Sequence, residues 1–422
     1  MLFCFRLPVP ALMSSEALPS AVLCSNAPCG RLPMADMASR GSSMKFSAKG
    51  LFEGASLDSL FVGLALVLVT AGVILVSSAS VEISAREHSN PLFFTLKHLV
   101  FLAIALVAGV VASLTPLSIV QRLGPLFVAA SAILLVAVLI PGVGLEANGS
   151  VRWIPFGPFS LQGSEFVKVF VVLYTASTLA RNADRIRQHI RHAGKLLLIL
   201  AGLVALLLEQ PDYGSAVVVM VPVIALVFLA GAPLRHFAPL VVVCIAACAA
   251  LAVVQPYRLT RLTTFADPWE HAFGSGYQLT QALIAFGRGE WFGLGLGNSI
   301  QKLFYLPEAH TDFLFSIAAE ELGAVGAIVL IVVLTALVVR GLMIGAEAFR
   351  ADFLFGAYCA WGMSLLIGVQ AAINIGVNVG VLPTKGLTLP LISFGGNSLI
   401  ASFLMLGVVI RVAWETRRGH GA

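Results

Sequence analysis

The chain has 422 residues, of which 59% are hydrophobic and only 11% are charged, and its mean hydropathy is +0.95. Soluble globular chains carry about 25% charged residues, so this composition excludes a water-soluble globular protein and indicates an integral membrane protein. The formal net charge of +5 is not concentrated in a basic run with interleaved aromatics, which argues against a nucleic-acid partner.

Residues 1–50 differ from the rest of the chain, because they are rich in Ser, Pro, Ala and Met and contain no sustained apolar run. Prolines interrupt the apolar segment that a signal peptide requires. We interpret this stretch as a disordered cytoplasmic tail or as the product of a mis-assigned start codon. The alternative start positions are Met34, Met37 and Met44.

Apolar runs follow that are suited to crossing a bilayer as helices. They span approximately residues 58–77, 98–114, 123–140, 165–181, 195–209, 215–231, 237–254, 312–339, 353–381 and 397–414. We therefore expect an all-α polytopic membrane protein with about ten transmembrane helices. Residues 51–415 form its membrane domain and residues 416–422 a short cytoplasmic tail.

The distribution of Lys and Arg between the loops predicts the orientation. Segment 181–195 contains Arg181, Arg185, Arg187, Arg191 and Lys195, and it is the strongest cytoplasmic signal. The other basic positions that fall on the same side are Arg122, Arg235, Arg340, Arg350, Arg417 and Arg418. Both termini are then cytoplasmic, and the outward loops are residues 78–97, 141–164, 255–311 and 382–396.

The loop 255–311, between the seventh and eighth helices, is the largest segment outside the membrane. It contains a helical pattern over residues 277–289, and we expect it to fold onto the membrane surface. Gly293, Gly295 and Gly297 resemble a nucleotide-binding loop, but no strand precedes them, so we expect a tight turn and close packing instead.

A charged side chain at membrane depth costs about 3 kcal/mol or more, and charged or polar groups there need an explanation. The residues of this kind are Glu165, Lys168, Glu209, Asp212, Asp312, Glu320, Glu321, Asn374 and Asn378. Glu165 and Lys168 have the i, i+3 spacing of an ion pair, which is either structural or part of a cavity.

The remaining polar groups each have two interpretations. Glu209 and Asp212 either mark the membrane interface or belong to a functional site. For Glu320 and Glu321 we favour a structural role, in which they cap a helix or snorkel to the interface. The two asparagines favour hydrogen bonds between helices. Asp312, at the expected start of the eighth helix, is either a helix cap or a functional carboxylate.

Residues 381–398 have the sequence VLPTKGLTLPLISFGGNS, which contains two prolines and three glycines between two apolar helices. A regular helix is excluded there, and irregular backbone at membrane depth must line a cavity or be buried in protein. Cys244 and Cys248 lie four residues apart in an apolar run, and we interpret them as packing residues, so no metal site is predicted.

Four stretches together resemble the SEDS family of peptidoglycan polymerases, which includes FtsW, RodA and SpoVE. They are NGSVRWIPFGPFSLQGSEFVKV, LEQPDYGSAVV, LPEAHTDFLFSIAAEELGAVGA and NVGVLPTKGLTLPLISFGGNS. Their wording is closer to the division branch, FtsW, than to the elongation branch. The sequence departs from the family pattern at Gly163, often Pro, and at Phe394 and Asn397, usually Tyr and Ser.

The resemblance implies a glycosyltransferase that polymerises lipid II, a disaccharide peptide on undecaprenyl diphosphate, into β-1,4 glycan during septal wall synthesis. Asp312 is then the catalytic general base of an inverting reaction. The residues that we assign to substrate binding are Arg152, Glu165, Lys168, Asp212, Arg258, Glu308, His310, Thr311, Lys385 and Ser393. Arg261 is a further candidate cation, and Mg²⁺ or Mn²⁺ is an alternative source of positive charge for the diphosphate.

The resemblance further implies a bacterial inner-membrane location at the septum, a class B penicillin-binding transpeptidase as partner, and contacts with other divisome membrane proteins. A flippase for lipid II is an alternative function, because buried charges and broken helices also suit transport. Two more candidate functions are an elongation polymerase and a division scaffold without chemistry.

Overall fold

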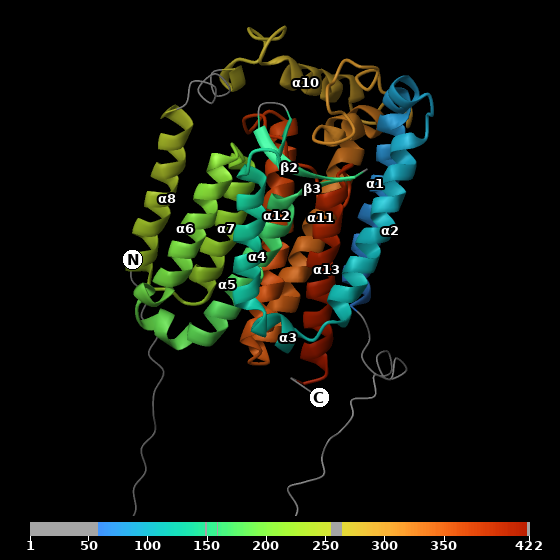
Figure 1. Cartoon of the computed structure of the whole chain (residues 1–422). Coiled ribbons are helices and arrows are strands. Elements are labelled where there is room, and N and C mark those ends of the chain that lie inside the picture. The colour runs from blue at the N-terminus through green and yellow to red at the C-terminus, as the bar shows by residue number, and fades with distance from the viewer. Residues whose placement is uncertain (1–57, 148–149, 158, 255–263, 420–422) are drawn as a thin grey trace, which may run out of the picture. The chain divides into compact units, whose positions relative to one another are not determined.

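The computed structural model describes residues 58–147, 150–157, 159–254 and 264–419. The predicted tail 1–50 and the cations Arg258 and Arg261 lie outside these residues. Helices occupy all the predicted spans (Figure 1). They are α1 (Ser59–His88), α2 (Phe93–Leu114), α4 (Gly124–Leu139), α5 (Gly163–Gln188), α6 (Gly194–Glu209), α7 (Tyr213–Leu229), α8 (Leu234–Val254), α11 (Leu314–Arg350), α12 (Leu354–Asn378) and α13 (Gly396–Arg417).

Among the described residues, six helical segments are individually long and apolar enough to cross a membrane. They are α1, α2, α11, α12, α13 and the segment Ile190–Glu209, in which the short 3-10 helix η2 (Ile190–Ala193) leads into α6. The helices α4 and α7, and α8 up to Cys244, are apolar but shorter. The expected all-α polytopic membrane protein is confirmed.

Several helices extend further than their apolar runs predicted. Helix α1 continues to His88, so residues 78–88 of the predicted outward loop are helical, and it ends at Ser89 with a left-handed φ of 52°. Helix α11 continues to Arg350 and places Arg340 inside a helix instead of a loop. Backbone hydrogen bonding does not depend on hydropathy, so a helix continues past the bilayer until a turn-forming residue ends it. For the same reason α13 reaches Arg417, inside the predicted tail.

A three-stranded antiparallel sheet, which the sequence did not predict, lies in the expected outward loop 141–164. Its strands are β1 (Leu145–Ala147), β2 (Ser150–Phe156) and β3 (Phe159–Gln162), in the order β1-β2-β3. The register pairs Trp153 of β2 with Gln162 of β3. Because β3 leads directly into α5 at Gly163, the sheet is held at the N-terminal end of that helix.

The long loop contains α10 (Tyr277–Gly289), which confirms the predicted helix, and Figure 1 shows it lying across the end of the bundle. A short α3 (Leu117–Arg122) lies at the opposite end. Helix α11 is broken at Gly323, which has φ of 72°. Gly293, Gly295 and Gly297 all have positive φ, so the predicted tight turn is confirmed.

Two buried carboxylates fasten this loop to α11. Glu320 accepts hydrogen bonds from Arg288 Nε (3.1 Å) and from Ser299 Oγ. Glu321 accepts from Lys302 Nζ at 3.0 Å. Both carboxylates are structural, but they act by ion pairing inside the protein and not by capping or snorkelling.

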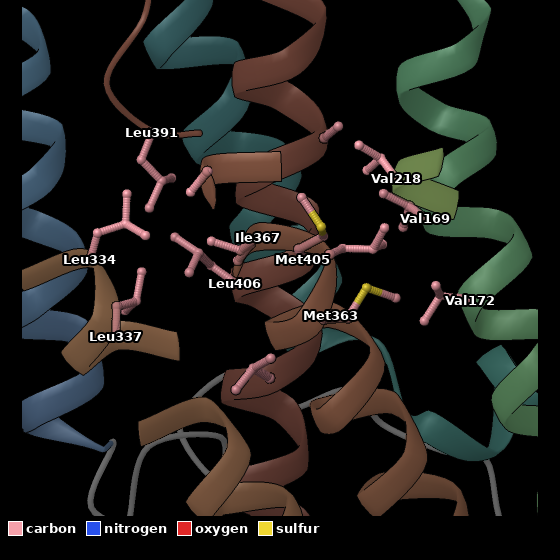
Figure 2. Close-up of a cluster of buried hydrophobic side chains, with 14 of the residues drawn as sticks. Val169, Val172, Val218, Leu334, Leu337, Met363, Ile367, Leu391, Met405 and Leu406 are labelled. Carbon is pink, nitrogen blue, oxygen red and sulfur yellow. The ribbon is translucent and has the colours of Figure 1, made fainter. Parts of the chain in front are cut away.

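The main core lies between α5, α7, α11, α12 and α13 (Figure 2). It brings together Val169 and Val172, Val218, Leu334 and Leu337, Met363 and Ile367, and Met405 and Leu406. Small residues permit close approach at its edges. A Cβ at Gly407 of α13 would lie only 2.3 Å from the carbonyl oxygen of Gly109 in α2.

The start of α1 and the end of α13 lie at the same end of the bundle. Asp58 caps α1 and accepts hydrogen bonds from Arg340 (2.6 Å) and Arg417 (2.7 Å). The hydrogen bond from Arg340 lowers the pKa of Asp58, against the opposing effect of burial. An even number of membrane crossings between Asp58 and Arg417 is therefore consistent with the fold.

Candidate functional site

A cavity of about 1480 Å³ lies beneath the sheet, between the start of α5, the α6–α7 turn and two irregular segments around residues 307–313 and 382–398. The predicted site residues on its surface are Arg152, Glu165, Asp212, Glu308, Thr311, Asp312 and Lys385. Residues from five separate parts of the sequence therefore meet in one cavity.

Asp312 lies two residues before α11, which begins at Leu314. Its predicted capping role is wrong, because the N-cap is Phe313 and no side chain caps the helix. The segment around Asp312 is a series of turns and not the first turn of a helix, so its carboxylate is directed by tertiary contacts.

The surroundings of Asp312 favour its neutral form more than water does. Burial raises the pKa of Asp312 to about 7, with further raising by the nearby charges of Glu308 and Glu165 and lowering by Arg152. Glu308 itself accepts a hydrogen bond from Thr311 Oγ1 at 2.7 Å. A carboxylate with a pKa near neutrality is suited to accepting a proton during a reaction.

Two amides of α12 hold the backbone of Asp312. Asn374 Nδ2 and Asn378 Nδ2 donate to the Asp312 carbonyl oxygen at 2.8 and 2.9 Å. Asn378 Oδ1 also accepts from Ser316 Oγ at 2.7 Å. The predicted hydrogen bonds between helices are therefore present, and they fix the segment that carries Asp312.

Glu165 and Lys168 form the predicted ion pair, with Nζ and Oε1 2.8 Å apart and both side chains at most 5% exposed. Gln370 completes the group, since its Oε1 accepts from Lys168 Nζ at 2.7 Å and its Nε2 donates to the Thr388 carbonyl at 3.0 Å. Glu165 lines the cavity, whereas Lys168 is one layer behind it. The cation that lowers the pKa of Asp312 is Arg152.

Arg152 projects from β2 onto the α6–α7 turn. Its NH2 donates to the Pro211 carbonyl at 2.6 Å, and its NH1 lies 3.9 Å from Asp212 Oδ1. Asp212 caps α7 through Ser215 N at 3.3 Å, so it is more than a marker of the membrane interface. The contact fixes the sheet over the cavity with a guanidinium at its mouth.

The irregular segment 382–398 lines the cavity, as its composition predicted. Lys385 places its ammonium 5.2 Å from the centre of the Tyr213 ring. Ser393 is buried, and its Oγ accepts from Leu389 N at 3.0 Å, so it supports the loop from within. Asn397, at a position where the family usually has Ser, donates to the Ser160 carbonyl at 2.7 Å and joins α13 to β3.

His310 also lies behind the cavity wall, packed between the rings of Phe94 and Phe394 at centroid distances of 5.0 and 5.4 Å. Burial lowers its pKa, against the raising effect of Glu308 and Glu87. The structure thus separates His310, Ser393 and Lys168 from the residues that face the cavity.

Several polar residues of the site were missed, including Lys97 and Gln370. Lys97 of α2 lines the cavity, and Gln370 binds Lys168. Gln370 lies within an apolar run, four residues before Asn374, which is itself four residues before Asn378. A search for polar residues at helical spacing detects that stripe.

Residues 58–418 match the family model named for FtsW, RodA and SpoVE, which is described as "Cell cycle protein". The chain belongs to the FtsW/RodA/SpoVE family. Among curated members, it is 48% identical over 369 residues to the "Probable peptidoglycan glycosyltransferase FtsW" of Pseudomonas fluorescens, covering 87% of this chain and 91% of the relative. It is also 48% identical over 379 residues to the protein of that name from Hahella chejuensis, covering 90% and 96%.

Solved structures of the family agree with this assignment. RodA of Thermus thermophilus matches at 27% identity with a TM-score of 0.62, covering 87% of this chain and 99% of RodA. A chain from the structure described as "Structural coordination of polymerization and crosslinking by a peptidoglycan synthase complex" matches at 28% identity with a TM-score of 0.71, covering 86% and 98%. The FtsW/RodA/SpoVE fold therefore extends over the whole described membrane region.

Proposed function

We propose that this chain is a peptidoglycan glycosyltransferase of the FtsW type, which polymerises lipid II into β-1,4 glycan strands during septal wall synthesis. The observation that carries the proposal is near full-length identity of 48% to proteins named peptidoglycan glycosyltransferase FtsW. The cavity supports it, because a carboxylate with a pKa of about 7 shares the cavity surface with Arg152, Lys97 and Lys385.

In the proposed reaction Asp312 acts as the general base. Its carboxylate takes the proton from the 4-hydroxyl of the acceptor sugar as that oxygen attacks the anomeric carbon of the donor. The bond from that carbon to the diphosphate breaks, and the lipid diphosphate leaves with the electron pair. The α-linked donor gives a β-linked product, so one base is sufficient and no carboxylate nucleophile is needed.

The leaving diphosphate requires positive charge, and the described cavity surface offers Arg152, Lys97 and Lys385. Arg258 and Arg261 remain candidates from outside the described residues. Within the described part of the chain, no group of three or more His, Cys, Asp or Glu is placed to hold a metal ion. Dependence on Mg²⁺ or Mn²⁺ remains a prediction, which chelation followed by readdition of each ion tests.

The lower part of the cavity suits a lipid chain. Its apolar lining comes from α6, α7 and α8 and includes Leu200, Val204, Met220, Ile224 and Val243. The charged groups lie at the opposite part of the cavity, around Asp312. A polyprenyl diphosphate has this same division into an apolar chain and an anionic head.

The setting in the cell follows from charge and family. We propose that the end carrying the sheet and α10 faces outward and that the Arg-rich turn after α5 faces the cytoplasm, because basic residues are retained there. We further propose an inner-membrane site at the septum and a class B penicillin-binding transpeptidase as partner, together with other divisome membrane proteins. A solved relative comes from a complex described as coordinating polymerization and crosslinking.

The decisive test uses the purified full chain with lipid II in detergent and in sealed vesicles, with the transpeptidase added where activity needs it. Wild type should form glycan chains on a gel, and Asp312→Asn should lose about 10²–10⁴-fold in rate. The matched control is Asp352→Asn, at the far end of α11, where Asn tolerates the positive φ of 59°.

Transport of lipid II across sealed vesicles without any polymer would replace the enzyme with a flippase. Polymer formation by Asp312→Asn within a few-fold of wild type would remove Asp312 as the base and direct attention to Glu308. Depletion in cells separates the branches of the family, since filaments indicate division and round cells indicate elongation.

A further inference from the structure

The turn that follows α10 exposes an unusual amount of apolar surface. Trp291 is 67% exposed, Phe292 is 84% exposed and Leu296 is 55% exposed. None of the roles assigned above to the cavity uses these side chains. Large exposed aromatics that neighbour one another indicate a surface that meets something other than water.

This turn is fixed to α11 by backbone hydrogen bonds at the helix break. Val325 N donates to the Trp291 carbonyl at 3.1 Å, and Leu294 N donates to the Glu320 carbonyl at 3.0 Å. The two backbones approach closely: a Cβ added at Gly323 would lie only 2.4 Å from Gly293 N. The aromatic side chains are therefore carried at a fixed height relative to α11.

The face of α11 directly below the break is an exposed apolar strip. Val325, Ile328, Val329 and Val332 are between 43% and 58% exposed, and their i, i+3, i+4, i+7 spacing places them on one face. They belong to the most hydropathic membrane span described, Leu314–Arg350. In a bilayer this strip contacts lipid, and Trp291 is hydrogen-bonded to its first residue.

We propose that Trp291 and Phe292 are immersed in the bilayer interface at the α10 end of the bundle and anchor the loop to lipid. The exposed apolar surface is continuous from the lipid-facing strip of α11 to the turn, which it joins at Val325. We therefore expect lipid to contact both. Tryptophan suits this position, since its ring is apolar and its N–H is polar, and it concentrates at membrane interfaces. Arg288, whose side chain is 40% exposed at the end of α10, adds a cation at headgroup height.

The anchor gives the loop a second attachment besides the Glu320 and Glu321 ion pairs. The anchor also fixes the height, relative to the membrane surface, of the short helical segment before Gly323 and of the turns around Asp312. The sequence analysis expected the loop 255–311 to fold onto the membrane surface. The present proposal assigns membrane contact to the turn that contains Trp291 and Phe292. The inference depends only on membrane insertion and not on the proposed enzyme activity.

Tryptophan fluorescence in lipid nanodiscs tests the anchor with the full chain alone. Phosphatidylcholine brominated at carbons 6 and 7 of its acyl chain should quench wild type more strongly than lipid brominated at carbons 11 and 12. Trp291→Phe should lose most of that difference. Trp269→Phe removes an exposed indole outside the turn and should retain it.

The proposal is overturned if Trp291→Phe and wild type show the same bromolipid quenching. Quenching of Trp291 by aqueous acrylamide alone would mean a water-facing turn, and protection from both quenchers would mean cover by protein. If Trp291→Phe fails to fold, Phe292→Trp in the otherwise native chain adds a second indole to the turn and should enlarge the difference in quenching between the two bromolipids, whereas an unchanged difference would overturn the proposal.

Discussion

Burial, with a further contribution from the charge on Glu308, is expected to set the pH at which the enzyme gains activity. With a pKa of about 7 for Asp312, roughly a tenth of the carboxylate is ionised at pH 6 and roughly nine tenths at pH 8. The active base is the ionised form, so the polymerisation rate should rise about tenfold over this interval and then level off.

Glu308→Gln removes a charge that raises the pKa of Asp312 while leaving an oxygen to accept the Thr311 hydrogen bond. The rising limb of the pH profile should therefore move to lower pH. A larger fraction of Asp312 is then ionised at pH 6, so the variant should gain rate there relative to wild type. Arg152→Gln removes a charge of the opposite sign and should move the limb to higher pH.

The assay is the initial rate of lipid II polymerisation by each variant from pH 5 to pH 9, fitted for the position of the limb separately from its height. Glu87→Gln is the matched control, because Glu87 raises the pKa of His310 but is not among the causes for Asp312. A limb near pH 4 in wild type would refute the reasoning, as would shifts of Glu308→Gln and Arg152→Gln in the same direction.

Further outcomes follow from the buried polar groups and from the orientation. Lys168→Ala leaves Glu165 buried without its ion-pair partner and should cost about 3–5 kcal/mol of stability, measured as a lower melting temperature in detergent. The exposed control Arg187→Ala should melt like wild type. If Lys168→Ala also melts like wild type, the buried pair does not stabilise the fold. Asn378→Ala loses a donor to the Asp312 carbonyl and should lower kcat about 10–100-fold with KM little changed; a loss in KM alone would contradict a positioning role. Reporter fusions should read outside after residues 90 and 270 and inside after residues 188 and 352; a cytoplasmic reading at 270 would invert the orientation.

The positions of the helices could be read from the sequence, but their ends could not. Hydropathy reports where a helix meets lipid, and α1 continues for eleven residues beyond its predicted end, through the polar stretch that closes at His88. The sheet was missed because β1 has only 3 residues and β3 only 4, too short for a clear alternation.

The membership of the site was predicted better than its geometry. Motifs identified Asp312, Glu165 and Arg152, and all three reach the cavity. Motifs give no side-chain direction, however, so His310 and Ser393 were grouped with residues that face the cavity although both point into its wall. Gln370 was missed although its spacing continues the polar stripe of Asn374 and Asn378, and its contact with Lys168 is visible only in the fold.

One face of α12 connects the two charged parts of the site. Gln370, Asn374 and Asn378 recur every four residues, so they lie one above another over about 12 Å of helix. Gln370 holds the ammonium of Lys168, while the two asparagines hold the carbonyl of Asp312. All three amides are buried, and a buried amide without its partner costs about 1–3 kcal/mol, which keeps these contacts made. The position of Asp312 relative to the Glu165–Lys168 pair is therefore set by α12 and not by the helix that Asp312 precedes, so a shift of α12 moves the base.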